Sequence, residues 1–308
     1  MKPCSTEFVA WCAGFFDAEG TISISRHDKK RVNSSPSFVL TAVCYQTERA
    51  PLDAMTQTFG GKLYYSSLRI WVWSVGARSA EDFLRAIRPY CRTKRPEIDI
   101  ALRFRKTFEG RWNQRVERAL VREREQYRQA LISYRTEKYA KTRVPKEERK
   151  KTAAPPRSKQ FLAWCAGFFD GDGTIGIMQN VDKSRRRAGQ NPSLRHSLQV
   201  ITYQTQREPL DAMCDVFGGG VYKQKNRVYA WHVGACVAEA FLVAVRPYVR
   251  VKGPEIDIAL EFRETFEGRG TTRLSEQLLR KREKLRTALN GYRKAKYAKN
   301  RKYARSQR

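Results

Sequence analysis

Residues 8–22 read FVAWCAGFFDAEGTI, and residues 161–175 read FLAWCAGFFDGDGTI. Each stretch is apolar, rich in Ala and Gly and without alternation, which predicts a buried helix. Each helix ends in an acid, a small residue, a second acid and a glycine. A carboxylate repeated at the end of a repeated helix predicts two half-sites related by a pseudo-twofold axis. That is the symmetry of a protein that reads and cuts a two-stranded polymer.

The repeat extends through most of the chain. Residues 45–55 recur as 203–213, and residues 88–111 recur as 246–269, with five extra residues in the second copy before position 203. The segment between the copies is rich in Pro, Lys and Arg and lacks a counterpart. We therefore predict an N-terminal half at 1–143, a linker at 144–159, and a C-terminal half at 160–308 that ends in a basic tail.

Within each copy the pattern predicts a helix, two strands, a helix, two strands, two helices and a long basic helix. Ser5 and Ser158 are expected to cap the first helix of each copy, which Gly20 and Gly173 end. In the first copy we also expect strands at 21–25, 38–45, 62–65 and 68–75. The further helices are expected at 51–59, after an N-cap at Ser79, beginning at Pro96, and at 113–139. We favour a long helix that packs on the back of the sheet over one that contacts DNA.

The composition indicates a folded, strongly basic protein. The 308 residues are 41% hydrophobic and carry a formal net charge of +30, from 61 Lys and Arg against 31 Asp and Glu. Such an excess indicates a polyanionic partner. Besides a DNA-binding protein, a ribosomal-type RNA binder or an anionic membrane surface would fit. No apolar run approaches the roughly 20 residues of a membrane-spanning helix, so we expect no membrane span.

Cysteine and histidine usage narrows the chemistry. The seven cysteines form no CxxC pair, and we interpret them as buried thiols in a reducing compartment rather than disulfides or zinc ligands. Only three histidines are present and they do not cluster, which argues against nucleases built on histidine–metal motifs.

The motif helices predict a paired-acid site. Their small residues (Ala10, Ala13 and Gly14, with Ala163, Ala166 and Gly167) leave a face on which two helix backbones can approach closely. Crossing there would bring Glu19 and Asp172 together at two helix C-termini. Two carboxylates about 4 Å apart repel by roughly 4 kcal/mol at an effective dielectric near 20, which protons or divalent cations would neutralise. Hard oxygen ligands favour Mg²⁺ over zinc.

The stretches from Trp11 to Gly20 and from Trp164 to Gly173 resemble the signature of the LAGLIDADG homing endonuclease family. The resemblance covers nearly the whole chain except the linker and tail. It implies an α+β fold of two pseudo-symmetric αββαββα halves, with a central pair of motif helices and two antiparallel four-stranded sheets that form a saddle on duplex DNA. Both copies have Cys-Ala-Gly where the family opens with Leu-Ala-Gly, and Glu19 replaces aspartate.

The resemblance also implies the site residues. The last acid of each motif, Glu19 and Asp172, would bind the metal, together with Ala18 and Gly171 before them, and Asp17 and Asp170 would be structural. Lys94 and Lys252 hold the position of the family's active-site lysine. Gln46 and Gln204, then Arg49 and Arg207, lie where the family keeps polar residues that order solvent. The alternative for the lysines and arginines is a phosphate contact or a surface position.

DNA reading would fall to the strands, because a strand rises about 3.3 Å per residue and a base pair about 3.4 Å. Alternation sends one face of each ribbon to the bases. The candidates in the first copy are Ser23, Ser25, His27, Thr41, Lys62, Tyr64, Ser66, Arg69 and Trp71. Those in the second are Gly176, Met178, Asn180, Gln199, Lys223, Lys225, Arg227 and Tyr229. Lys29, Lys30, Arg31 and Arg185, Arg186, Arg187 would be phosphate contacts from loops. Because these faces differ between the copies, we expect an imperfectly palindromic target of roughly 20 base pairs.

The leading hypothesis is a monomeric, site-specific DNA endonuclease that cuts both strands and, by the resemblance, leaves short 3′ overhangs. We expect Mg²⁺ as cofactor, with Mn²⁺ able to replace it and Ca²⁺ binding without cleavage. An intron-homing enzyme fits, in an organelle, the nucleus or the cytoplasm. The alternatives are an RNA maturase that binds its host intron and a DNA-binding regulator that does not cut. The presence of both motif acids favours the nuclease over either.

Overall fold

The computed structural model describes residues 4–28, 35–67, 70–108, 117–141, 157–182, 193–224, 228–266 and 275–306. By its contacts the chain divides into two units, and we describe each by itself. Unit 1 comprises residues 1–153 and 157–171, and unit 2 comprises 154–156 and 172–308. The second motif helix therefore belongs to unit 1 except for its last residue. The predicted linker overlaps residues 142–156, which lie outside the described part.

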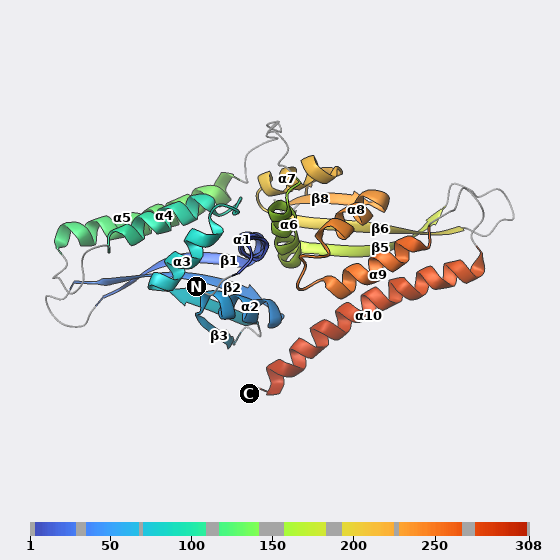
Figure 1. Cartoon of the computed structure of the whole chain (residues 1–308), viewed down its shortest axis with the longest axis horizontal. Coiled ribbons are helices and arrows are strands. Elements are labelled where there is room, and N and C mark those ends of the chain that lie inside the picture. The colour runs from blue at the N-terminus through green and yellow to red at the C-terminus, as the bar shows by residue number, and fades with distance from the viewer. Residues whose placement is uncertain are drawn as a thin grey trace. The chain divides into compact units, whose positions relative to one another are not determined.

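Unit 1 contains a four-stranded antiparallel sheet in the order β1-β2-β4-β3. Helices cover one face of this sheet (Figure 1). The elements of the first copy are α1 (Thr6–Glu19), β1 (Gly20–His27), β2 (Ser37–Gln46), α2 (Ala50–Phe59), β3 (Lys62–Tyr65), β4 (Trp71–Gly76), α3 (Ala77–Ile87), α4 (Arg95–Lys106) and α5 (Arg118–Lys141).

The second copy repeats the order, with a sheet β5-β6-β8-β7 in unit 2. Its elements are α6 (Lys159–Asp172), β5 (Gly173–Asp182), β6 (Ser193–Gln204), α7 (Glu208–Phe217), β7 (Gly220–Lys223), β8 (Tyr229–Gly234), α8 (Ala235–Val245), α9 (Gly253–Glu264) and α10 (Glu276–Ser306). The α+β class and the duplicated helix–strand order are confirmed. No helix in the described ranges is long and apolar enough to cross a membrane.

Local signals place the motif helices as expected. The Ser5 hydroxyl accepts the Phe8 N–H at 3.1 Å, and the Ser158 hydroxyl accepts the Phe161 N–H at the same distance. These bonds satisfy helix donors that would otherwise lack a partner. The first strand of each copy begins directly at the glycine that ends its motif helix. The motif acids therefore lie where a helix meets its sheet.

The start of α3 was predicted wrongly. Ser79 does not cap this helix, which begins at Ala77 directly after the last residue of β4. Ala77 has a φ of 50°, and its counterpart Ala235 has a φ of 47°, so the same left-handed turn joins strand to helix in both copies. An alanine in this conformation is strained, and nothing in the sequence signals it.

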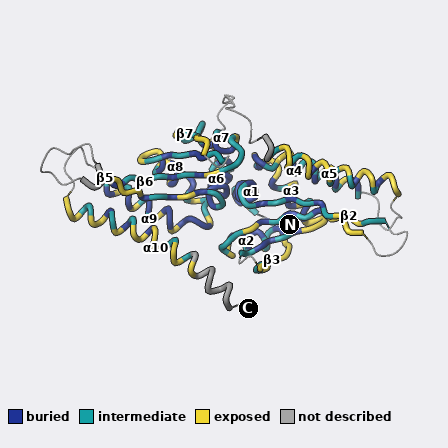
Figure 2. The backbone as a smooth tube through the Cα atoms, turned by 180° about the vertical axis from the view of Figure 1, so that it is seen from behind, coloured by how far each residue is buried: buried dark blue, intermediate teal, exposed yellow. Residues whose placement is uncertain are grey.

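The long helix α5 packs against α4 and β1, as favoured from the sequence. Buried Leu120 and Leu131 lie on its packed side, while much of the rest of the helix is exposed, as the yellow parts of α5 in Figure 2 show. The buried Arg124 guanidinium donates to the Thr107 hydroxyl and carbonyl at 3.1 and 2.9 Å and lies 3.6 Å from the centre of the Phe108 ring. A buried charged residue thus anchors the long helix.

The same anchor recurs in unit 2. Arg282 of α10 donates to the Thr265 hydroxyl and carbonyl, both at 2.9 Å, and lies 3.6 Å from the centre of the Phe266 ring. The duplication therefore extends to the side chains that fix each long helix against its own half.

The cysteine prediction holds in part. All seven cysteines lie in the described ranges as thiols rather than disulfides, and Cys12, Cys44, Cys91 and Cys165 are buried. Cys4 and Cys214 are only partly buried, however, and Cys236 on α8 is exposed, which corrects the expectation that the thiols are buried. The Arg263 guanidinium donates to the Cys236 sulfur at 3.3 Å.

Candidate active site and nucleic-acid face

The two motif helices α1 and α6 touch backbone to backbone. A Cβ added to Gly14 would lie 2.0 Å from the Trp164 carbonyl oxygen, and one added to Gly167 would lie 2.0 Å from the Trp11 carbonyl oxygen. Only glycine fits at either position. The expectation that small residues allow a close crossing is thereby confirmed, since each glycine receives the carbonyl of the other helix.

Each motif tryptophan binds the first acid of the other motif. The Trp11 indole N–H donates to Asp170 at 2.9 Å, and the Trp164 indole N–H donates to Asp17 at 3.0 Å. Both acids and both tryptophans are buried. This exchange satisfies four polar groups that would be costly to bury alone. The tryptophans are therefore part of the core, as expected, rather than platforms for nucleic-acid bases.

Asp17 also holds the loop between α3 and α4. Its carboxylate accepts backbone N–H bonds from Arg92, Thr93 and Lys94 at 2.7, 3.2 and 2.9 Å. With the Trp164 indole, four donors surround one buried carboxylate. This occupies the oxygens of Asp17 within the protein, which agrees with the structural role expected for it.

The second acid of the first motif, Glu19, is only partly buried at the end of α1. A Cβ at Gly171 would lie 2.5 Å from the Ala18 Cβ and 3.1 Å from the Glu19 Cγ. The second motif therefore has glycine where the first has alanine, because the side chains of the first motif fill that space. Gly171 directly precedes Asp172, the second acid of its motif.

Lys94 lies beside the end of α1. Its ammonium group donates to the Asp17 carbonyl at 2.6 Å. Burial raises the pKa of the Cys44 thiol, and the charges of Lys94 and Glu19 act on that thiol in opposite directions. The Lys94 ammonium group is thus held at the end of α1, two residues before the motif acid Glu19.

In unit 2 a predicted glutamine reaches its motif acid. The Gln204 amide donates to the Asp172 carboxylate at 3.2 Å, and its carbonyl oxygen accepts the Thr205 N–H at 2.8 Å. Gln46 makes the equivalent bond to the Thr47 N–H at 2.7 Å. Because the amide oxygen accepts a backbone N–H, the orientation of each amide is fixed and its NH₂ group points away from that bond. Lys252 is buried at the N-cap of α9.

The predicted arginines bind within their own helices. Arg49 pairs with Asp53 at 3.1 Å, and its guanidinium lies 4.9 Å from the centre of the Trp71 ring. Arg207 pairs with Asp211 at 2.9 Å. Both arginines stand at the N-terminus of a helix, where the paired aspartate is favoured. These contacts orient the arginines along α2 and α7.

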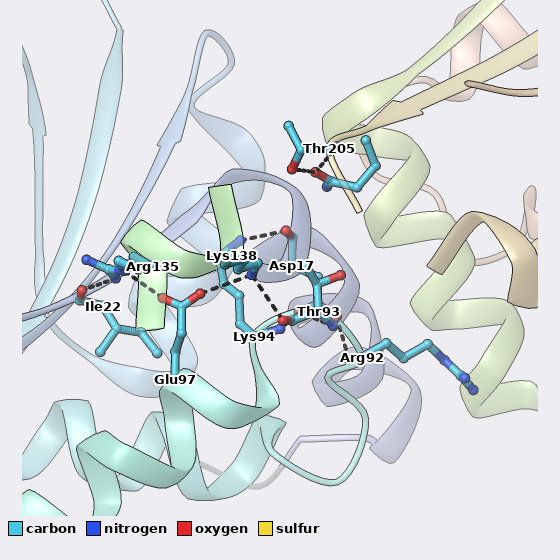
Figure 3. A network of polar contacts seen from close by, with 10 residues as sticks. Asp17, Ile22, Arg92, Thr93, Lys94, Glu97, Arg135, Lys138 and Thr205 are labelled. Carbon is cyan, nitrogen blue, oxygen red and sulfur yellow. Dashed lines mark hydrogen bonds and ion pairs between the residues drawn. The ribbon is translucent and has the colours of Figure 1, made fainter. Parts of the chain in front are cut away.

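A network behind the first motif links it to the long helix α5 (Figure 3). Buried Glu97 pairs with Arg135 at 2.8 Å and with Lys138 at 3.1 Å, and Lys138 also donates to the Thr93 carbonyl at 3.2 Å. Arg135 further donates to the Ile22 carbonyl of β1. Sequence reasoning missed this network, because its members are distant in sequence and lie within ordinary charged helices.

We expect the network to make stability depend on pH. Burial favours the neutral form of Glu97, but Lys138 and Arg135 outweigh it, and the pKa of Glu97 is lowered below its usual value. The charged pair therefore stabilises the fold above the unfolded pKa, about 4.3, and this contribution is lost as pH falls through the lower folded pKa. Glu97→Gln should lower the free energy of unfolding by about 2 kcal/mol at pH 7 and flatten its acid dependence.

Urea unfolding of wild type and Glu97→Gln from pH 3 to 7 measures this. Glu276→Gln is the matched control, because the Glu276 side chain is 78% exposed in its pair with Arg280. Equal acid dependence in wild type and Glu97→Gln would contradict the role given to the network.

The acid at each motif end is a type of ligand that suits a hard divalent cation, but the number of such ligands is small. Glu19 and Asp172 offer carboxylate oxygens, the ligands that Mg²⁺ and Ca²⁺ prefer. Within the described residues, no group of three or more His, Cys, Asp or Glu could hold a metal ion.

Of the predicted DNA contacts that lie in the described residues, most are on the uncovered face of a sheet. Residues paired across antiparallel strands share a face. The pairs Ser23–Thr41 and Gly176–Gln199 lie on the uncovered face, and Ser25, His27, Met178 and Asn180 follow with the same alternation. Ser66 lies in the turn after β3, and its hydroxyl donates to the Ile70 carbonyl at 3.0 Å.

The predicted alternation was wrong in the second hairpin of each copy. Tyr64 pairs with Val72, and Lys62 pairs with Ser74, on the uncovered face. Trp71 pairs with Tyr65 on the helix-covered face, and Tyr229 pairs with Lys223 in the same way. A count from the turn cannot fix which face a residue takes, because a shift of one residue reverses it.

Sequence reasoning missed three tyrosines on the uncovered face. Tyr45 and Tyr64 flank Val72 across three strands, and Tyr203 and Tyr222 flank Ala230 in the same row of the second sheet. The four tyrosines are 37–57% exposed, whereas Val72 and Ala230 are each 2% exposed. Only Tyr64 was predicted as a contact. The other three could have been found from the sequence, because a tyrosine occupies the same strand position in both copies.

Several predicted contacts lie outside the described residues. They are Lys29, Lys30, Arg31, Arg69, Arg185, Arg186, Arg187, Lys225 and Arg227.

Comparison with known proteins agrees with this geometry. Residues 165–240 match the family model described as LAGLIDADG endonuclease. The fold, with its paired motif helices, matches solved homing endonucleases over more than nine-tenths of the chain. The chain has the LAGLIDADG fold. The resemblance inferred from the motifs is confirmed.

Three solved structures illustrate the likeness. The LAGLIDADG homing endonuclease I-GzeII in complex with its DNA target is 15% identical, with a TM-score of 0.64, and the match covers 92% of this chain and 97% of that one. I-SmaMI bound to its uncleaved DNA target is 13% identical with a TM-score of 0.68, covering 94% and 99%. The meganuclease I-AabMI bound to uncleaved DNA is 17% identical with a TM-score of 0.67, covering 92% and 98%. A search of curated proteins gave no match.

Proposed function

We propose that this LAGLIDADG protein is a site-specific DNA endonuclease that hydrolyses both strands of a long, imperfectly palindromic target and leaves short 3′ overhangs. The observation that carries the proposal is the reciprocal packing of the two motif helices, in which Gly171 receives the Ala18 and Glu19 side chains. A helix pair built only for stability would not need an acid at each end, where the helix dipole disfavours it.

The proposed cofactor is Mg²⁺, with Mn²⁺ as a substitute and Ca²⁺ binding without cleavage. I-SmaMI has been solved with uncleaved DNA in the presence of calcium ions, which supports a divalent cation here. Glu19 and Asp172 would hold the metal, with Ala18 and Gly171 beside them. When bound, such an ion would stabilise negative charge on a phosphodiester and help to activate water.

The remaining roles belong to the protein's own side chains. Gln204 would hold the Asp172 carboxylate in position through its 3.2 Å bond. Lys94, fixed at the end of α1, would stabilise the charge that develops on the phosphate. Lys252 would do the same in the second half. Arg49 and Arg207 would order solvent from the N-termini of α2 and α7.

The uncovered sheet faces would bind the DNA. I-GzeII and I-AabMI have both been solved bound to DNA, which supports the same partner for this chain. The faces of the two copies differ at most positions and agree at their tyrosines. Binding of two unlike half-sites by one chain requires no second copy, so we propose a monomer. We further propose a role in intron homing, within a reducing compartment that contains DNA.

Cleavage of a randomised duplex library tests the proposal. We expect discrete double-strand cuts at one imperfect palindrome of roughly 20 base pairs in Mg²⁺, and binding without cuts in Ca²⁺. Sequencing of the cut ends gives both the target and the overhang. Selective binding without cuts in Mg²⁺ or Mn²⁺ would contradict the nuclease and leave a regulator or a maturase, and a binding assay with intron RNA separates these two.

A further inference from the structure

The outward face of α8 is apolar in a strongly basic protein. Cys236, Val237, Ala240 and Val243 are all exposed, the two valines to 37% and 56%. Their spacing of three, four and seven residues places them on one stripe of the helix. Single exposed apolar residues are ordinary, whereas exposed apolar residues gathered on one stripe of a helix are typical of a binding surface.

The first copy provides an internal control. In α3, the positions equivalent to this stripe are occupied by Arg78, Ser79, Asp82 and Arg85, and all four are exposed. The buried residues of the two helices are nearly the same: Ala, Phe and Leu recur in order. The fold therefore does not require an apolar outer face at this position, and the difference belongs to the second copy alone.

The helix next to α8 also differs in charge from its counterpart in the first copy. Helix α9 contains four acids and one arginine, whereas α4 contains four basic residues and two acids. Exposed Glu261 and Glu264 replace Arg103 and Lys106. Helices α8 and α9 lie side by side (Figure 1), and Arg263 of α9 pairs with Glu239 of α8 at 2.9 Å. The helix beside the apolar stripe thus has more acids than bases on a chain whose net charge is +30, although Arg263 itself lies against the stripe and donates to the Cys236 sulfur at 3.3 Å.

We propose that the α8–α9 face, defined by the apolar stripe of α8 and by Glu261 and Glu264, binds a protein partner that offers an apolar helix face flanked by Lys or Arg. Charge complementarity favours this partner. Nucleic acid and anionic lipid would be repelled by the acids. A second copy joined through a twofold axis would place acid against acid and bring two highly basic chains together. The α8–α9 face binds this partner whether or not the protein cleaves DNA.

A displayed library of helical peptides tests this directly. The peptides are about 20 residues long, long enough to form a helix, and are randomised on all faces. They are selected on the full-length wild-type chain. We expect the enriched sequences to carry apolar residues at helical spacing and a net positive charge, and to bind at least about tenfold more tightly than charge-reversed versions.

The first copy supplies the matched variants. Cys236→Arg, Val237→Ser, Ala240→Asp and Val243→Arg together give α8 the outward face of α3, and should abolish enrichment while leaving the melting temperature and DNA binding unchanged. The reciprocal variant, with Arg78→Cys, Ser79→Val, Asp82→Ala, Arg85→Val, Arg103→Glu and Lys106→Glu, should create binding on the first copy. Gain of binding cannot be explained by misfolding.

Three results would overturn the proposal. One is enrichment of neutral or acidic peptides, and another is equal enrichment on wild type and the α8 variant, including none on either. The third is a concentration-dependent dimer, seen by sedimentation of the chain alone, that the α8 variant abolishes, because it would make a second copy the occupant. Absence of DNA cleavage in the duplex-library assay would count against the nuclease and not against the α8–α9 face.

Discussion

Asp172→Asn is expected to slow target cleavage in Mg²⁺ by about 10³-fold, and Glu19→Gln to do the same. Each change replaces a charged oxygen ligand by a neutral amide, which a hard cation binds poorly. A loss of about 4 kcal/mol in transition-state stabilisation corresponds to that rate, because each factor of ten is about 1.4 kcal/mol. DNA binding measured in Ca²⁺ should change little, since the sheets carry the proposed interface. Single-turnover cleavage and fluorescence anisotropy measure the two quantities.

We expect that the two motif acids can be replaced without loss of the fold. Gln204 donates to Asp172, and an asparagine side chain could still accept that bond through its carbonyl oxygen, so the fold should persist. Glu276→Gln, an exposed acid at the start of α10, is the control for loss of negative charge. Cleavage that survives both motif substitutions would refute the assignment. Parallel losses of cleavage and binding would make the acids structural.

Gly14→Ala is expected to cause a larger loss of stability than Glu97→Gln. The added Cβ would lie 2.0 Å from the Trp164 carbonyl oxygen and 2.9 Å from the Phe168 N, both backbone atoms that cannot rotate away. The helices would have to separate, which would strain the Trp11–Asp170 and Trp164–Asp17 bonds. We expect a loss of about 3 kcal/mol in the free energy of unfolding, measured by urea denaturation.

Gly291→Ala in α10 is the matched control. Nothing lies within 4 Å of a Cβ added there, so the same substitution should stabilise the helix by about 0.5–1 kcal/mol. Opposite signs for the two variants would establish that packing, rather than helix propensity, explains the effect at Gly14. A neutral Gly14→Ala would contradict the backbone contact between α1 and α6.

The duplicated motif, the helix caps and the order of elements could be predicted because they depend on local signals. Ser5 and Ser158 cap helices through bonds that span three residues, and apolar spacing follows helical or strand geometry within a few turns. The close crossing of the motif helices was also predictable, since only Ala and Gly leave room for it. The spacing of the acids after each helix completed the site hypothesis.

Other features depend on contacts between residues far apart in sequence. The Trp11–Asp170 bond spans 159 positions, and the Arg135 bond to Ile22 spans 113. No periodicity identifies such partners, because each side chain belongs to an ordinary local pattern and only packing selects the pair. The left-handed turn at Ala77 and the face taken by Trp71 were decided in the same way.

The sequence by itself therefore determined the duplication, the helix that ends in acids and the class of metal ligand. The tertiary structure alone decided that Asp17 is enclosed by N–H donors while Glu19 remains partly exposed. It also decided which tyrosines lie on the uncovered sheet face, and that α8 turns an apolar stripe outward. The physical reason is that propensity acts over a few residues, whereas burial and strand register are properties of the assembled fold.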